Sequence, residues 1–296
     1  MKVPSILFQD IWSQFTQRPD PVLSYHKDFN DRWIPVRTTS YLKNILMRVL
    51  VFKNLGLEVG DRLILSIHSG YEFDLLEKAA FCMGLNLLCV DRFTPTPLLV
   101  SYFNPSDKSL FLADENSLLS EIQLKVPSCK VRQVLLLQFR EQLKIYEKEQ
   151  LSDLEKKVEE TMAREPNPQD REFWDHLTCY TITTSGSTGS PKVLCYTQKQ
   201  VLDSIHEISL FLGKISPGEV VISWLPMSNL FQRVFNLIAL RLGAVLYYED
   251  NPKRLPSSLR QIRPSILIGV PFFFDKVNKS VRDRLDTLSR GLLKRS

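Results

Sequence analysis

Apolar residues along this chain alternate between short continuous runs and helical spacings from about residue 40 onward. Residues 39–56 place apolar side chains at helical spacing and lead into the short apolar run 61–67, which is typical of a buried strand. Because strands alternate with helices, the pattern predicts βαβ units and an α/β fold of mostly parallel sheets flanked by helices. Further strands are expected at residues 85–91, 109–114, 131–139, 178–184, 193–198, 218–226, 244–250 and 264–271, and further helices at 71–84, 97–103, 198–213 and 231–243.

The stretch 141–172 interrupts this rhythm. It holds ten acidic and six basic residues, with Leu151, Leu154, Val158 and Met162 at helical spacing. A solvated surface helix followed by a linker explains this composition better than a binding function. We therefore expect a first α/β subdomain over residues 1–172 and a second subdomain over residues 173–296.

Composition is ordinary for a soluble globular protein, with 44% hydrophobic and 24% charged residues. The net charge of +5 resides in the tail, where residues 276–296 carry seven basic and two acidic side chains. A nucleic-acid-binding protein is expected to be basic across its fold, so that class is disfavoured. With neither a signal peptide nor a membrane-spanning run in the sequence, a cytoplasmic location is expected, with weak peripheral membrane contact as the further option.

The tail itself predicts one amphipathic helix. Its apolar residues share one face, which we expect to pack against the sheet. Binding to anionic lipid headgroups is the alternative for a basic amphipathic helix. The residues of this face are Val277, Val281, Leu285, Leu288 and Leu292.

Cysteine and histidine usage predicts neither a disulfide framework nor a metal site. The five cysteines are odd in number and form no CxxC pair, which is typical of reduced, buried thiols. The four histidines are scattered without ligand spacing.

The segment Thr183–Lys192, TTSGSTGSPK, carries the most informative chemistry. Its glycines let the backbone approach a ligand closely, and successive N–H groups in such a turn form a concave nest for anions. Hydroxyl groups add donors for phosphate oxygens, and Lys192 adds positive charge. The predicted phosphate-binding residues are Thr184, Ser185, Gly186, Ser187, Thr188, Gly189 and Lys192.

The same segment departs from the Walker A loop. Ser190 and Pro191 separate the second glycine from the lysine, and a strand rather than a helix is expected to follow. A plain hydrophilic turn between two strands is the alternative, because Gly, Ser, Thr and Pro all favour turns.

This segment resembles the signature loop of the adenylate-forming superfamily, which includes acyl-CoA synthetases and peptide-synthetase adenylation domains. In that family the loop holds the β- and γ-phosphates of ATP while a carboxylate attacks the α-phosphate, giving acyl-AMP and pyrophosphate. Val193 stands where the family usually has glycine. The resemblance implies ATP, Mg²⁺ and CoA as cofactors or co-substrates, with a carrier-protein thiol as the alternative acceptor.

A second resemblance narrows the branch to long-chain fatty acid–CoA ligases. Residues 224–248 are similar to that family's LPLSHxFER segment and the apolar helix after it, and residues 250–277 are similar to the stretch with a strand ending in GVP. Residues 23–42 and 56–91 resemble the opening of the same enzymes. Asn229 replaces the family's histidine, and Phe272 replaces an arginine. The resemblance implies an acyl pocket with Asn229, Phe231, Gly269 and Phe272, although core packing is the alternative for the phenylalanines.

Family members continue with segments that do not appear in these 296 residues. Those segments hold the magnesium-binding glutamate, a ribose-binding aspartate and a C-terminal lid domain with the catalytic lysine. We therefore expect an incomplete N-terminal domain, without the lid and without a complete catalytic set. The expected function is activation of a fatty acid to acyl-AMP and acyl-CoA as part of a longer ligase. The alternatives are a non-catalytic nucleotide- or acyl-binding fragment and a structural remnant.

Overall fold

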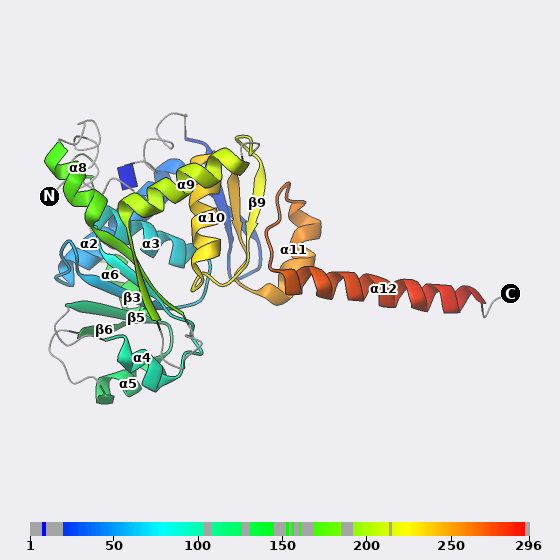
Figure 1. The fold of residues 1–296 in the computed structure, drawn as a ribbon, viewed down its shortest axis with the longest axis horizontal. Coiled ribbons are helices and arrows are strands. Elements are labelled where there is room, and N and C mark those ends of the chain that lie inside the picture. Colours follow the sequence, from blue (N-terminus) through cyan, green and yellow to red (C-terminus); the bar gives the residue numbers. More distant parts are fainter. Residues whose placement is uncertain are drawn as a thin grey trace.

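The computed structural model describes most of the chain, and its elements form two sheets with helices between and around them (Figure 1). The described residues are 8–9, 20–103, 108–125, 131–144, 152–153, 156, 160, 168–184, 192–212 and 215–293.

The larger sheet, as far as the chain is described, has six strands in the order β6-β5-β3-β4-β7-β8. Neighbouring strands run parallel except for β7 and β8, which form an antiparallel hairpin. Parallel pairing follows because helices separate most of these strands in the sequence. The strands are β3 (Arg62–Ser66), β4 (Asn86–Cys89), β5 (Ser109–Ala113), β6 (Val131–Leu135), β7 (Thr178–Thr184) and β8 (Lys192–Thr197).

The smaller sheet has the order β2-β1-β10-β9, counted over the described residues. It brings together segments far apart in the sequence, because β1 pairs in parallel with β10, which in turn pairs in parallel with β9; β1 also pairs antiparallel with β2. Its strands are β1 (Val22–Lys27), β2 (Trp33–Arg37), β9 (Val220–Ser223) and β10 (Val245–Tyr248).

One layer of helices packs against both sheets in a common apolar core. Strand side chains divide between faces: Leu63 and Leu65 of β3 enter this core, whereas Ile64 faces the opposite side of the sheet. Both faces of the larger sheet are thus buried, as the continuous apolar runs predict. The shared layer contains α2 (Thr38–Asn54), α3 (Tyr71–Met83), α9 (Gln198–Leu212) and α10 (Leu230–Arg241).

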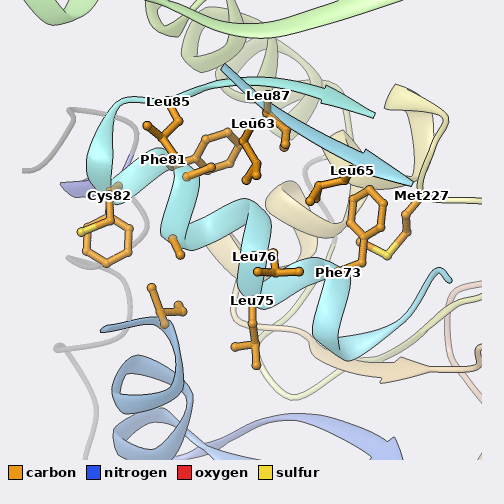
Figure 2. Close-up of a cluster of buried hydrophobic side chains, with 14 of the residues drawn as sticks. Leu63, Leu65, Phe73, Leu75, Leu76, Phe81, Cys82, Leu85, Leu87 and Met227 are labelled. Atoms are coloured by element: carbon orange, nitrogen blue, oxygen red, sulfur yellow. The ribbon is translucent and has the colours of Figure 1, made fainter. Parts of the chain in front are cut away.

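Three of the remaining helices cover the outer faces of the sheets. Helices α4 and α5 pack on the outer face of the larger sheet, and α11 packs on the outer face of the smaller one. Figure 2 shows the shared core around α3, where Leu63 and Leu87 lie beside Phe81. The helices outside the shared layer are α4 (Thr96–Ser101), α5 (Asn116–Lys125), α6 (Leu136–Leu143), α8 (Pro168–His176), η1 (Pro252–Arg254), α11 (Leu255–Ile262) and α12 (Pro271–Leu293).

The α/β fold with helix-flanked, mostly parallel sheets is confirmed, but some element predictions were wrong. The strand expected at 131–139 ends at Leu135, and α6 follows because Leu136 and Phe139 enter the core at helical spacing. The strand expected at 264–271 is a single bridge from Ile266 to Val221. There the Trp224 indole N–H donates to the Ile268 carbonyl at 2.8 Å, in place of a ladder bond.

Several further expectations need correction or stay open. Helix α12 does not pack against a sheet but extends away from the rest of the molecule (Figure 1). The loop expected near 164–172 is partly helical, because α8 begins at Pro168. Cys82, Cys89 and Cys179 are buried as expected, whereas Cys195 is exposed. The charged stretch lies largely outside the described residues, and the subdomain boundary at 172 stays a prediction.

Candidate functional site

A cleft of about 420 Å³ opens where strands of the larger sheet end and α10 begins. Its walls come from three places: the end of β4 and the turn after it, the end of β7, and the residues that start α10. In open α/β sheets, ligands bind outside the carboxyl ends of parallel strands, which is the position of this cleft. The described lining residues are Cys89, Val90, Asp91, Thr94, Ile182, Thr183, Ser228, Asn229 and Leu230.

The predicted phosphate loop leaves the sheet at the wall of this cleft. Thr183 lines the cleft, and the next residue, Thr184, pairs in register with Lys192 of β8. Lys192 is exposed at the start of that strand. The two ends of the loop are therefore held side by side at the cleft. Ser185, Gly186, Ser187, Thr188 and Gly189 lie outside the described residues.

Asn229 is the predicted acyl-pocket residue that reaches the cleft. It is the N-cap of α10, and its side-chain oxygen accepts a hydrogen bond from the backbone N–H of Phe231 at 3.0 Å. The cap satisfies one of the free N–H groups of the first turn. The start of a helix also carries partial positive charge, so this wall of the cleft favours an anion.

The other predicted acyl-pocket residues are not among the described lining residues of the cleft. Phe231 and Phe272 are exposed. Gly269 lies under two aromatic rings: a Cβ at this position would be 3.0 Å from the Phe274 ring and 3.2 Å from the Phe273 ring. An apolar acyl pocket formed by all four residues therefore stays a prediction.

A buried ionic network lies directly behind the cleft. Arg233 of α10, fully buried, contacts the Cys89 sulfur at 3.1 Å and the Glu77 carboxylate at 3.6 Å, and its guanidinium lies 4.5 Å from the Tyr180 ring centre. Cys89 lines the cleft, and Tyr180 belongs to β7. Arg233 of α10 thus contacts both β4, at its cleft-lining end, and β7.

The network extends through α3 to α2. Lys78 donates to Asp74 at 2.7 Å and to Glu77 at 2.8 Å, and the Tyr41 hydroxyl of α2 donates to Asp74 at 2.5 Å. Burial alone would raise the pKa of Glu77, but Lys78 and Arg233 outweigh it and hold that pKa below its usual value. Burial raises the pKa of Cys89 to about 12, so this thiol is protonated at neutral pH.

No group of three His, Cys, Asp or Glu side chains in the described part of the chain is placed to hold a metal ion. Within the same part, every helix is too short or too polar to cross a bilayer.

The sequence comparison decides the family. A family model described as AMP-binding enzyme matches residues 46–293, which is most of the chain. The chain belongs to the AMP-binding enzyme family. The matched region of this family member includes the phosphate-loop segment, the cleft residues and all of the buried network except Tyr41.

Curated relatives of this family member are long-chain fatty acid–CoA ligases. Fatty acyl-CoA synthetase A of Dictyostelium discoideum is 25% identical over 261 residues, covering 83% of this chain and 37% of that protein. Long-chain-fatty-acid–CoA ligase 2 of Schizosaccharomyces pombe is 28% identical over 132 residues, covering 42% of this chain and 19% of that protein. The chain therefore spans less than two fifths of the length of either relative.

Solved structures confirm the fold. The inhibitor-bound N-terminal domain of FACL13 from Mycobacterium tuberculosis superposes with a TM-score of 0.72 at 17% identity, over 92% of this chain and 64% of that domain. McyG A-PCP, solved with phenylalanyl-adenylate, superposes with a TM-score of 0.71 at 17% identity, over 94% of this chain and 42% of the other. The resemblance to the N-terminal part of adenylate-forming enzymes is thus confirmed.

Sequence reasoning missed several cleft residues of this family member. Asp91 and Thr94 directly follow a buried strand run, so their place at its carboxyl end was a usable signal. Arg233 stands at the last position of the LPLSHxFER resemblance, but that local match does not reveal which strands its side chain will meet.

Proposed function

We propose that this chain forms the ATP- and acyl-binding part of a long-chain fatty acid–CoA ligase. The observation that carries the proposal is the position of the phosphate loop: it starts and ends at the cleft formed by β4, β7 and α10. The family and the curated relatives support the same chemistry.

The proposed reaction has two steps. A carboxylate oxygen of the fatty acid bonds to the α-phosphorus of ATP, the bond from that phosphorus to the bridging oxygen breaks, and pyrophosphate leaves. The CoA thiolate then bonds to the acyl carbon, and AMP leaves with the electron pair of the broken C–O bond. Catalysis of this kind depends on positioning and on stabilisation of charge at phosphorus.

Residues of the chain would each support part of the first step. Thr184, Ser185, Gly186, Ser187, Thr188 and Gly189 would hold the β- and γ-phosphates, with the Lys192 ammonium countering their charge. Lys192 fits this role because it is exposed beside the cleft edge, opposite Thr184. Mg²⁺ would neutralise further phosphate charge when bound. The start of α10 would favour the negatively charged carboxylate or phosphate at the other wall.

Nucleotide binding tests this proposal. An ATP analogue with a methylene bridge between its α- and β-phosphorus atoms, which is unreactive at the α-phosphorus and keeps the β- and γ-phosphates, should raise the melting temperature of the chain, because a ligand that binds only the folded state stabilises it. Lys192→Ala should remove most of that shift. Lys199→Ala is the matched control, because Lys199 is an exposed lysine on α9 paired with Asp203. An equal shift in Lys192→Ala, or none in the unaltered chain, would contradict the proposal.

Turnover separates this ligase from the alternative of a nucleotide-binding fragment without catalysis. Palmitate-dependent exchange of labelled pyrophosphate into ATP reports the first step directly. We expect the chain alone to bind the analogue without measurable exchange, because its relatives carry further segments. The ligase proposal requires that pyrophosphate exchange appear when the further segments of the relatives are supplied. If no exchange appears with those segments present, the binding-only alternative is favoured.

A further inference from the structure

The loop of residues 67–70 joins β3 to α3 and contacts the elements behind two walls of the cleft. None of its residues belongs to the described lining of the cleft. The conformation of this loop therefore bears on the distance between the two walls. They are the β4 wall, formed by Cys89, Val90, Asp91 and Thr94, and the α10 wall, formed by Ser228, Asn229 and Leu230.

The outer part of the β4 wall is a tight turn. The Thr94 N–H donates to the Asp91 carbonyl at 2.9 Å, and the Phe93 N–H donates to the Asp91 carboxylate at 2.8 Å. Asp91 and Thr94 line the cleft, whereas Arg92, at the tip between them, is not among the described lining residues. Whatever holds Arg92 therefore holds this wall from outside the cleft.

The Arg92 guanidinium has three partners on neighbouring elements. Its Nε donates to the Asp114 carboxylate at 3.2 Å, and its two terminal nitrogens contact the His68 ring and the Glu115 carboxylate. The Asp114 carboxylate also accepts from the His68 backbone N–H at 2.8 Å. An isolated surface ion pair contributes little to stability, but a planar fork of donors held by several partners fixes orientation. Arg92 thus ties the β4 wall to the loop of residues 67–70.

The other end of the same loop holds the α10 wall. The Ser69 hydroxyl accepts from the Met227 backbone N–H at 2.7 Å, and the Gly70 N–H contacts the Met227 sulfur at 3.4 Å. Met227 is buried, and it lies in the turn that the Asn229 N–H closes on the Pro226 carbonyl at 3.1 Å. The residues that follow Met227 are those of the α10 wall, so Ser69 holds this wall where α10 begins.

Gly70 gives the loop a backbone conformation that side chains disfavour. Its φ of 137° and ψ of −163° fall in a region that is populated essentially by glycine alone. A Cβ here would be in ordinary contact with Asp250, at 3.4 Å, so the restriction comes from the backbone. The loop geometry that carries His68 and Ser69 to different walls therefore requires glycine at this position.

We propose that Arg92 and Ser69 are positioning residues that set the separation of the β4 and α10 walls through the loop of residues 67–70. A ligand that touches both walls binds more tightly when they are held at the right distance before it arrives, because less order is lost on binding. Their role in ligand binding rests on the proposed function, whereas the link between the walls does not. Arg233, which contacts Cys89, provides a second route behind the cleft.

Hydrogen exchange measures the link without any ligand. Arg92→Met removes the guanidinium and should speed exchange at least about threefold in residues 91–95 and also in residues 226–231 across the cleft. Lys108→Met is the matched control, because it removes an ion pair with Asp61 at 3.3 Å near the opposite ends of β3 and β5. This control should leave both segments unchanged. Faster exchange confined to residues 91–95 in Arg92→Met would overturn the proposal.

A double substitution identifies the route. Ser69→Ala removes the acceptor of the Met227 N–H and should speed exchange in residues 226–231, whereas Ser69→Thr keeps a hydroxyl and should retain the slow rate. Adding Arg92→Met to Ser69→Ala should change exchange in residues 226–231 less than about 1.5-fold, because residues that act through one contact are not additive. Additive effects would mean that Arg92 acts through other contacts, those of Arg233 among them, and would overturn the proposal.

Ligand binding tests the positioning role itself. The methylene-bridged ATP analogue should bind Arg92→Met at least about threefold more weakly than Lys108→Met, because the walls must then be ordered on binding. Both variants should melt within about 2 °C of the unaltered chain, since each loses only partly exposed ion pairs. Equal affinities would overturn the positioning role. If the analogue does not bind the unaltered chain, the proposed function is refuted, and hydrogen exchange alone decides whether the walls are linked.

Discussion

At the scale of single residues, Gly84 shows how closely one position can be constrained. It ends α3 in the left-handed region with φ of +70°, and a Cβ there would lie 2.4 Å from the Trp174 ring. Trp174 is buried on α8, directly before β7. The absent side chain thus lets α8 pack against the turn between α3 and β4.

Gly84→Ala should destabilise the protein by about 2–4 kcal/mol. The left-handed conformation accounts for about 1–2 kcal/mol and the overlap with Trp174 for the rest. Gly56→Ala is the matched control, because Gly56 has φ of +78° and no atom within 4 Å of its Cβ position. Urea unfolding of both variants measures the difference. Equal losses would show that the Trp174 contact contributes nothing.

At the scale of elements, α10 both packs on β9 and forms one wall of the candidate cleft. Its buried side is partly polar: Gln232 accepts from the Leu225 N–H at 3.1 Å, and Asn236 donates to the Ser223 hydroxyl at 3.0 Å. These bonds fix the helix on β9. Its first residues form one wall of the cleft, so anything that loosens the first turn also changes the site.

Asn229→Ala should cost about 1 kcal/mol of folding free energy, because it removes the cap on the Phe231 N–H. Asn229→Asp should retain most of the stability, since a carboxylate also caps and favours the start of a helix. Chemical unfolding at neutral pH compares the two. A loss of equal size in both variants would mean that the amide has a role other than capping.

At the scale of the whole molecule, the network around Glu77 joins the layers. Tyr41 of α2, Lys78 of α3, Arg233 of α10 and Tyr180 of β7 all meet at two buried carboxylates. Such a network gains little net stability over apolar packing, but removing one partner leaves another charge unpaired. It therefore makes the packing of helices on the larger sheet sensitive to pH.

Glu77→Gln should destabilise the protein by about 3–5 kcal/mol at pH 7, because Lys78 and Arg233 lose their shared counter-charge. The pKa of Glu77 is lowered in the fold, so its contribution is present above its usual value of 4.5 and is lost as pH falls from there through the folded value. The variant should approach the unaltered protein in stability as pH falls toward 3.

Urea titrations from pH 7 to 3 test this dependence. Asp203→Asn is the control, because its partner Lys199 is exposed and solvent screens the pair, so this variant should leave the stability nearly unchanged across the range. A constant difference between Glu77→Gln and the unaltered protein across this range would contradict the pKa assignment.

The sequence predicted local structure well and spatial relationships poorly. The helices α2, α3, α9 and α10 were found from their periodicity, because each buries one face. The pairing of β1 with β10 was missed, since its partners are more than 200 residues apart. Helix α12 was misjudged because an apolar stripe indicates that a helix has a partner without indicating where the partner lies.

The residues of the candidate site also divide into those that local sequence motifs predicted and those that only the folded structure brings together. Asn229 was identified from a local motif and lines the cleft, and Lys192 lies at the start of β8 opposite Thr184, with its predicted role still a prediction. Arg233 contacts Cys89 and Tyr180, which only folding brings together. Phe272 was assigned to a pocket because its segment resembled one, but its side chain faces solvent.

The pairing of Thr184 with Lys192 has a consequence for the tolerance of the phosphate loop to change. Because the β7–β8 hairpin joins the two ends, the entropy of closing the loop is lost during folding and not when a ligand binds. Closure entropy grows slowly, by about 0.6 kcal/mol for each doubling of loop length. Insertions here would leave the hairpin stable while displacing the predicted phosphate donors, so variants of this loop should be recognised by lost ligand binding in a protein that still folds.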